Sequence, residues 1–293
     1  QHARETGGPA LRAMTFHQRA NMLKALAQYL NERREPLYEL SYDTGATKAD
    51  SQIDIDGGIG TLFVYASKGR RELPDDVIHV DGALEQLSRD GAFVGQHVAT
   101  SLQGVAVHIN AFNFPVWGML EKLAPTLLAG VPAIVKPASA TAWLAEAAFR
   151  MIVESGLLPE GAVQFVAGGL GDLLDRLGGQ DVVSFTGSAS TAAMLRANRN
   201  LLANSVRFIA EQDSLNASIL GPDAEPGTPE FDAFIREVHR EITVKAGQKC
   251  TAIRRIFVPN EHREAVIEVI ADRLAKTVVG DPRSEATRMG ALA

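Results

Sequence analysis

The sequence predicts an α/β protein whose core is a doubly wound, Rossmann-type parallel sheet. From about residue 105 to residue 197, short apolar runs of strand length alternate with stretches of helix length, as in consecutive strand–helix–strand units. The chain has 293 residues, of which 46% are hydrophobic and 22% charged, so it can bury a sizeable core. Because ligands of such sheets bind beyond the carboxyl ends of the strands, the loops that follow the strands are the candidates for chemistry.

The composition excludes several classes of protein. There are 29 Lys and Arg against 35 Asp and Glu, a net charge of -6, and no long basic run, so we expect no nucleic-acid partner. No apolar run reaches the roughly 18 residues that cross a bilayer, and the first residues lack the order of a signal peptide, so we expect a cytoplasmic protein with no membrane partner. One Cys and seven His residues without ligand spacing predict no metal site. The start at Gln1 and the end at MGALA indicate a fragment of a longer protein.

The first part of the chain is predicted to be helical scaffold. Residues Thr15 to Gln18 match a capping box, and apolar residues recur at helical spacing from Met22 to Leu30. A looser helical pattern follows over residues 34–67, and we interpret Gly57 to Gly60 as breaks in it. Leu73-Pro74 ends this helical region.

A hairpin and four strand–helix units are predicted next. Residues 91–109 are β-rich, with Gly at the turns, and predict a hairpin followed by a buried strand. The four units are VAVHI with a helix at 117–128, PAIVK with one at 143–155, VQFVA with one at 170–177, and DVVSF with one at 190–197.

The loops after the first two strands carry polar side chains in unusual settings. Asn113 lies in an apolar loop, where its amide is suited to donate to a developing oxyanion, although an Asn that merely closes a turn fits the loop alone better. Lys136 and Ser139 come at the next strand end and helix start, which suits ribose hydroxyls or a phosphate. A solvated Lys and a helix-capping Ser fit that loop equally well.

Two further loops add candidate residues. Gly187 and Ser188 occupy a strand-to-helix turn where backbone N–H groups and a hydroxyl can face a pyrophosphate, but no GxGxxG motif accompanies them. Glu211 lies between two apolar runs, where burial would raise the pKa of its carboxyl and suit it to act as a general base. The alternative for Glu211 is a structural ion pair with an Arg.

Cys250 is the one thiol in the chain. It lies in the polar, glycine-containing segment KAGQKC, ahead of an apolar strand and near Lys245 and Lys249. Reactive thiols favour such electropositive, accessible settings, whereas a lone cysteine judged by its own loop is more often an inert core residue.

Taken together and in order, these loops resemble the aldehyde dehydrogenase superfamily. The family's N-F-P, K-P-A, F-T-G-S, Glu-containing and G-Q-x-C loops all occur here in the family's order, and the resemblance covers essentially the whole chain. Five ordered motifs are specific where each alone is weak. The resemblance implies that Cys250 is the nucleophile, that Glu211 activates the deacylating water, and that Asn113 binds the oxyanion.

The resemblance also implies a nicotinamide cofactor. Lys136 and Ser139 would face its adenosine ribose. Ser188 and Gly187 would face its pyrophosphate. Asn110 and Phe112 would make two further contacts with the cofactor. Family members with Glu at the Ser139 position use it to hold a ribose hydroxyl and repel a 2′-phosphate. Because Ser139 removes that repulsion, we expect NADP, with NAD as the alternative.

Two departures from the family pattern stand out. The usual L-G-G after the general-base Glu is Gln212-Asp213-Ser214 here, and Ala192 replaces a Gly in the F-T-G-S helix. The second change slightly crowds the approach of the cofactor.

The closer resemblance is to the bifunctional subfamily of phenylacetate degradation. Its members join an oxepin-CoA hydrolase domain to a 3-oxo-5,6-dehydrosuberyl-CoA semialdehyde dehydrogenase, and the segments DIDGGIGTLF, HINAFNFPVWGMLEKLAP and KAGQKCTAIRRI are similar to theirs. This implies a small-molecule aldehyde substrate linked to CoA, a homo-oligomer, and a fused C-terminal hot-dog hydratase domain. The alternatives are a 3,4-dehydroadipyl-CoA semialdehyde dehydrogenase of a benzoyl-CoA pathway and a non-catalytic nucleotide-binding relative.

The expected domain organisation follows the same family. Residues 1–82 and 103–213 would form the dinucleotide-binding domain, and residues 83–102 a projecting β-hairpin for oligomerisation. Residues 214–293 would begin a second α/β catalytic domain and stop short of its end.

Overall fold

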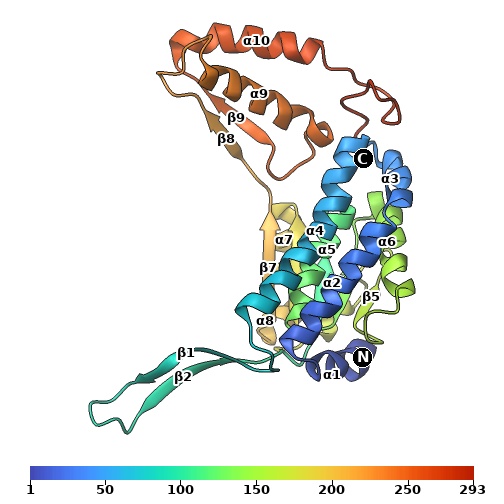
Figure 1. Ribbon diagram of the computed structural model, residues 1–293, viewed down its shortest axis with the longest axis vertical. Coiled ribbons are helices and arrows are strands. Elements are labelled where there is room, and N and C mark those ends of the chain that lie inside the picture. Colours follow the sequence, from blue (N-terminus) through green and yellow to red (C-terminus); the bar gives the residue numbers. More distant parts are fainter. The chain divides into compact units, whose positions relative to one another are not determined.

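The computed structural model describes residues 1–293, and the chain divides into two compact units. Residues 1–34 and 55–211 form unit 1, and residues 35–54 and 212–293 form unit 2. Figure 1 shows the helices and strands of each unit. Residues 35–54 therefore pack with unit 2, whereas the division expected from sequence assigned them to the dinucleotide-binding domain.

A five-stranded sheet forms the centre of unit 1, with strand order β5-β4-β3-β6-β7. Its strands are β3 Ala106–Ile109, β4 Ala133–Lys136, β5 Val163–Phe165, β6 Val182–Gly187 and β7 Arg207–Gln212. The central strand β3 pairs in parallel with β4 on one side and β6 on the other. The chain thus runs outward from β3 in one direction and then returns to build the other half, which is the doubly wound topology predicted from sequence.

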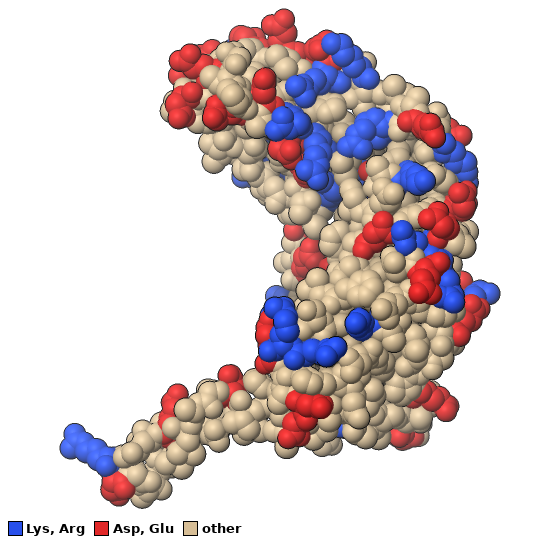
Figure 2. Space-filling model, viewed as in Figure 1, with Lys and Arg blue, Asp and Glu red and all other residues tan.

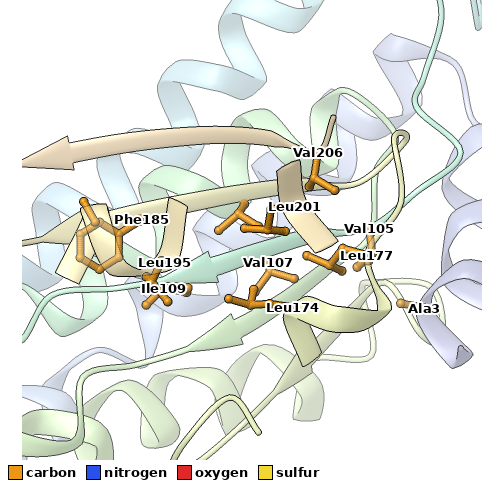
Figure 3. Close-up of a cluster of buried hydrophobic side chains, with 12 residues drawn as sticks. Ala3, Val105, Val107, Ile109, Leu174, Leu177, Phe185, Leu195, Leu201 and Val206 are labelled. Atoms are coloured by element: carbon orange, nitrogen blue, oxygen red, sulfur yellow. The ribbon is translucent and has the colours of Figure 1, made fainter. Parts of the chain in front are cut away.

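Both faces of this sheet are covered. On one face α5 packs against β3 and β4 and contacts α2 and α6. On the other face Val107 and Ile109 of β3 join the apolar cluster shown in Figure 3, which includes Leu174, Leu195 and Leu201. The covering helices are α2 Phe16–Glu32, α5 Pro115–Leu128, α6 Ala142–Glu154, η4 Leu173–Arg176, α7 Ala189–Arg196 and α8 Arg199–Ala203.

The helical start of the chain agrees with the sequence pattern in one respect and differs in another. The capping box is confirmed, because the Thr15 side chain accepts from the Gln18 N–H and the Gln18 side chain accepts from the Thr15 N–H. Gly57, Gly58 and Gly60 are not breaks, because α4 runs unbroken from Lys48 to Glu72. A Cβ at Gly57 would lie 2.7 Å from the Trp117 ring, and one at Gly58 2.9 Å from the Trp117 backbone. These glycines therefore allow close helix packing.

A long hairpin extends from unit 1, as Figure 1 shows. It pairs β1 His79–Gln86 with β2 Val94–Ala99 in antiparallel register, with an irregularity between Asp81 and Glu85. The hairpin starts at His79, earlier than the predicted residue 83, because the polar residues of β1 do not show the apolar pattern of a buried strand. A second difference concerns the helix expected at 170–177, where the structure has only the short helix η4, Leu173–Arg176.

Unit 2 contains the parallel pair β8 Asn216–Ile219 and β9 Ile253–Phe257, with α9 Pro229–Thr243 between them in the chain. Its core includes Leu220, Phe231 and Val266. The other helices of this unit are α3 Glu35–Ser41, η2 Tyr42–Thr44, η5 Val244–Gly247, η6 Asn260–His262 and α10 Arg263–Ala275.

Three short helices lie in unit 1, namely η1 Ala3–Gly7, α1 Gly8–Arg12 and η3 Ser139–Thr141. No helix of the chain is both long and apolar enough to cross a bilayer.

Candidate active site

The predicted cofactor residues of unit 1 gather at one edge of the sheet. Because β3, β4 and β6 run in parallel, their carboxyl ends lie together, and the register places Ile109 beside both Lys136 and Phe185. The residues at or just after these strand ends define what we call the strand-end edge: Asn110, Phe112, Asn113, Lys136, Ser139, Gly187 and Ser188. The structure therefore brings together all of the cofactor positions predicted from sequence, along with Asn113.

The loop that carries Asn113 is held at both ends. The Asn110 N–H donates to the Lys136 carbonyl oxygen at 3.0 Å, and the Thr141 hydroxyl donates to the Phe112 carbonyl oxygen at 2.9 Å. Asn113 itself is half-buried just before α5. The Asn110 side chain is buried, and neither polar atom of its amide has a hydrogen-bond partner.

The hydroxyls of Ser139 and Ser188 differ in their surroundings. Ser139 is exposed at the start of η3, and neither η3 nor α6 has a side-chain cap, so the interpretation of Ser139 as a helix cap is wrong. Ser188 does cap α7, since its oxygen accepts from the Thr191 N–H at 3.2 Å. Of these two serines, Ser188 caps a helix and Ser139 does not.

Glu211 is placed differently from the expectation. It lies near the end of β7, which is the edge strand of the sheet, and its side chain is exposed. The burial on which the general-base prediction rested is therefore absent, because one side of an edge strand has no neighbour. No Arg pairs with Glu211, and its one hydrogen bond comes from the Thr186 hydroxyl at 3.5 Å.

Glu211 and Thr186 line a pocket of about 590 Å³ in unit 1. Trp117, Glu121 and Lys122 of α5 also line it. Lys122 is mostly buried, and its ammonium lies 3.3 Å from a Glu121 carboxylate oxygen. These two residues were missed from sequence, although a Glu-Lys pair in the otherwise apolar helix α5 is a signal that could have found them.

His108 also lines this pocket, from the middle of β3. Burial, followed by the charge of Lys122, lowers the pKa of His108 to about 3. The imidazole Nε2 lies 3.1 Å from the Thr126 hydroxyl oxygen. His108 is therefore neutral at physiological pH and adds a polar but uncharged group to the pocket.

Cys250 belongs to unit 2, where it is exposed in the turn between η5 and β9. We call residues 244–252 the Cys250 turn. The Asn216 side-chain amide donates to the Cys250 carbonyl oxygen and to the Ala252 carbonyl oxygen, the latter at 3.1 Å. The Arg254 guanidinium donates to the Gly247 carbonyl oxygen at 2.8 Å. The backbone around the thiol is thus fixed by side chains from β8 and β9.

The two lysines near Cys250 are not the free cations that the sequence suggested. Lys249 forms an ion pair of 2.7 Å with Glu241, and its side chain is largely buried. Lys245 is buried, which lowers its pKa, while the charges of Asp54 and Asp50 act in the opposite direction. An electropositive setting for the thiol therefore receives no support from either side chain.

The whole chain, residues 1–293, matches the model of the aldehyde dehydrogenase family. The chain belongs to the aldehyde dehydrogenase family. It is 49% identical over 298 residues to 3,4-dehydroadipyl-CoA semialdehyde dehydrogenase of Aromatoleum evansii, an alignment that covers 100% of the chain and 57% of that relative. It is 27% identical to alpha-ketoglutaric semialdehyde dehydrogenase of Bacillus subtilis (strain 168), with 97% of the chain and 55% of that relative covered. The chain thus spans little more than half the length of these relatives.

Solved structures, among them an aldehyde dehydrogenase, show the same fold. Betaine aldehyde dehydrogenase of Staphylococcus aureus in complex with NAD+ superposes with a TM-score of 0.83 at 24% identity, covering 99% of the chain and 56% of that structure. An oxidoreductase of Marinobacter aquaeolei superposes with a TM-score of 0.82 at 26% identity, covering 99% and 59%. The fold and superfamily predicted from sequence are confirmed. The bifunctional subfamily is not shown by these matches, since the 49% relative carries the name of the alternative.

Proposed function

We propose that the complete protein oxidises a CoA-linked semialdehyde to the carboxylic acid with a nicotinamide cofactor, and that Cys250 is the nucleophile. The observation that carries this proposal is the exposed Cys250 thiol, the one thiol of an aldehyde dehydrogenase family chain. Its turn is fixed by the Asn216 amide. An exposed thiol on a rigid backbone is suited to attack a carbonyl carbon.

Each residue has a defined task in the proposed reaction. The Cys250 thiolate attacks the aldehyde carbon, and the Asn113 amide donates to the oxyanion of the resulting thiohemiacetal. Loss of hydride from that carbon leaves a thioester on Cys250. Glu211 then takes a proton from a water molecule as its oxygen attacks the thioester carbon, the carbon–sulfur bond breaks, and the acid and the Cys250 thiolate are released. The exposure of Glu211 leaves it accessible to water.

The strand-end edge fits a dinucleotide. The buried Asn110 amide has polar atoms without a protein partner, and the Ser139 hydroxyl is exposed and caps no helix. Lys136 adds a cation at the end of β4. When bound there, the nicotinamide supplies the hydride acceptor. The relation to betaine aldehyde dehydrogenase, a structure in complex with NAD+, agrees with this class of cofactor.

We favour NADP over NAD. The 2′-phosphate of NADP carries negative charge, and Ser139 presents no carboxylate that would repel it. Lys136 is half-buried three residues before Ser139 in the chain, and a nearby cation stabilises a phosphate. The Ser139→Glu variant is expected to lose preference for NADP by roughly tenfold or more, which corresponds to about 1.4 kcal/mol.

The substrate is assigned from the relative with 49% identity, whose name specifies 3,4-dehydroadipyl-CoA semialdehyde. The second candidate is 3-oxo-5,6-dehydrosuberyl-CoA semialdehyde, which the motifs HINAFNFPVWGMLEKLAP and KAGQKCTAIRRI favour. The two substrates share a CoA thioester and an aldehyde and differ in chain length. A fused hydratase domain in the complete protein would favour the second candidate.

The test is a steady-state assay of the complete protein. Reduction of NADP and NAD is followed with both CoA-linked semialdehydes and with simple short aldehydes, and the matched control is Cys250→Ala. We expect the highest kcat/KM with a CoA-linked semialdehyde and NADP. Equal kcat/KM for short aldehydes would contradict the substrate assignment, and a strong preference for NAD would contradict the role of Ser139. A protein that binds cofactor but shows no burst of reduced cofactor would instead be a non-catalytic relative.

We also propose that the hairpin β1–β2 mediates homo-oligomerisation. Its exposed apolar side chains include Val80, Leu84, Leu87, Phe93, Val94 and Val98. Figure 2 shows that residues other than Lys, Arg, Asp and Glu cover most of its surface. Exposed apolar patches of this kind mark interaction surfaces. A double Leu84→Glu/Val98→Glu variant is expected to have a lower molar mass in light scattering than the unsubstituted protein.

A further inference from the structure

Three consecutive residues of the Cys250 turn have a left-handed backbone. The φ angles are 55° at Lys245, 52° at Ala246 and 70° at Gly247. Glycine adopts this region freely, but residues with a side chain do so rarely, and each persists only where its surroundings impose it. Lys245 and Ala246 are two such residues in succession, a few residues before Cys250, and therefore require an external constraint.

The constraint comes from α4. The Lys245 N–H donates to the Asp50 carboxylate at 3.0 Å, across 195 residues of sequence. Asp50 is fixed in turn by Thr47, whose hydroxyl donates to the second carboxylate oxygen at 2.9 Å. Asp54 lies one helical turn further along α4, so that both carboxylates share one face of the helix.

The contact between Lys245 and the acidic residues of α4 is buried. The exposed fractions are 5% for Lys245, 1% for Asp50 and 0% for Asp54. Buried carboxylates need a cation or several donors. Asp50 has the Lys245 N–H and the Thr47 hydroxyl and N–H as donors. Both carboxylates stabilise the Lys245 ammonium, and Asp54 has the larger effect.

The constraint is passed on toward Cys250 through the backbone. The Gln248 N–H and the Gln248 side-chain amide both donate to the Lys245 carbonyl oxygen, at 3.0 Å and 3.1 Å. A shift of Lys245 therefore moves Gln248, which lies two residues before the thiol. Lys249 is attached separately, through Glu241.

We propose that Lys245 is a positioning residue that ties the Cys250 turn to α4 through Asp50 and Asp54 and so sets the place of the thiol. Lys245 does not touch the reacting atoms. The proposal rests on the proposed role of Cys250 as nucleophile. If the proposal holds, the role of Cys250 also depends on the buried Lys245 and on two acidic residues of α4, a helix far from Cys250 in sequence.

The test compares Lys245→Met with Asp54→Asn, with the double variant Lys245→Met/Asp54→Asn, and with Lys245→Arg. Lys276→Met is the matched control, because it removes an exposed Lys–Asp ion pair of the same unit. Hydrogen exchange is measured by mass spectrometry for peptides from residues 244–252 and from β3 and α10. Steady-state kcat and KM are measured on the same complete proteins.

Lys245→Met is expected to raise exchange over residues 244–252 by roughly tenfold or more, with β3 and α10 unchanged. It is expected to lower kcat by roughly 10-fold to 100-fold at unchanged KM, because small displacements of a reacting group are costly. The double variant should recover part of both losses, since it no longer buries an Asp54 charge without its cation. Lys245→Arg and Lys276→Met should keep the protection of residues 244–252.

Unchanged exchange over residues 244–252 in Lys245→Met would overturn the proposal. A rise of equal size in α10 of the same unit, or in β3, would also overturn it, because it would show general destabilisation. If Lys245→Met does not fold, Asp54→Asn alone must give the local rise, and its absence overturns the proposal. The exchange measurement needs no turnover. Activity retained by Cys250→Ala would therefore refute the proposed nucleophile and leave the exchange result to be judged by itself.

Discussion

At the strand-end edge of unit 1 the backbone of a parallel sheet places the functional side chains, whereas in the Cys250 turn of unit 2 other side chains place the backbone. Asn110 and Lys136 lie near each other because β3 and β4 are paired in register. Cys250 is held by Asn216 of β8, and the turn before it by Asp50 of α4. Loss of one side chain at the sheet edge should leave its backbone in place, whereas loss of one side chain that holds the turn should let the backbone of the turn move.

The largest effect is expected from the turn. Cys250→Ala should abolish aldehyde oxidation, because the proposed covalent intermediate forms on the Cys250 sulfur, the one thiol of these 293 residues. The formation of reduced cofactor measures this, and circular dichroism checks that the variant is folded. Measurable turnover in this variant would show that catalysis does not pass through the turn at all.

A smaller loss is expected at the strand-end edge. Asn113→Ala removes one oxyanion donor, which should lower kcat by about 100-fold to 1,000-fold. Because the loop is also held by its backbone and by Thr141, the free energy of unfolding should change little. A change confined to KM would mean that Asn113 binds substrate without stabilising the oxyanion.

The pH dependence of stability tests the buried part of unit 1. The unfolded chain takes up a proton on His108 below its ordinary pKa of 6.5, whereas the folded chain does so only below about 3. Acidification between these values therefore favours unfolding, by about 2 kcal/mol at pH 5. Urea unfolding of His108→Gln, which keeps a polar group beside Thr126, should show a smaller loss of stability between pH 7 and pH 5. Equal losses in both proteins would contradict the burial of His108.

The smallest effect is expected from loosening the turn at one point. Asn216→Ala removes two hydrogen bonds to the carbonyl oxygens of Cys250 and Ala252, which should lower the free energy of unfolding by about 1 kcal/mol. Asn260→Ala, at an exposed Asn of the same unit, is the control. Urea unfolding measures both. An equal or larger loss in the control would show that the two hydrogen bonds from Asn216 contribute nothing special to the stability of the turn.

The contrast also explains what could be predicted from sequence. The strand-end residues follow from local patterns, because an apolar strand followed by a polar loop is visible in a few consecutive residues. Asp50 and Asn216 could not be assigned to the thiol, because their contacts with residues 245 and 250 span long stretches of chain that no periodicity links. The prediction that Glu211 is buried was wrong for a related reason. Its apolar flanks suggest a central strand, but β7 lies at the edge of the sheet.

The contact of Gly57 and Gly58 with Trp117 limits how this family member can vary. Trp117 forms part of the pocket wall in unit 1, and the two glycines leave no room for a methyl group between α4 and α5. Even alanine, the smallest alternative, would force Trp117 or α4 to shift. The seat of one wall residue of the pocket therefore depends on two residues that have no side chain, on a helix that contributes Thr61 and Tyr65 to the same wall.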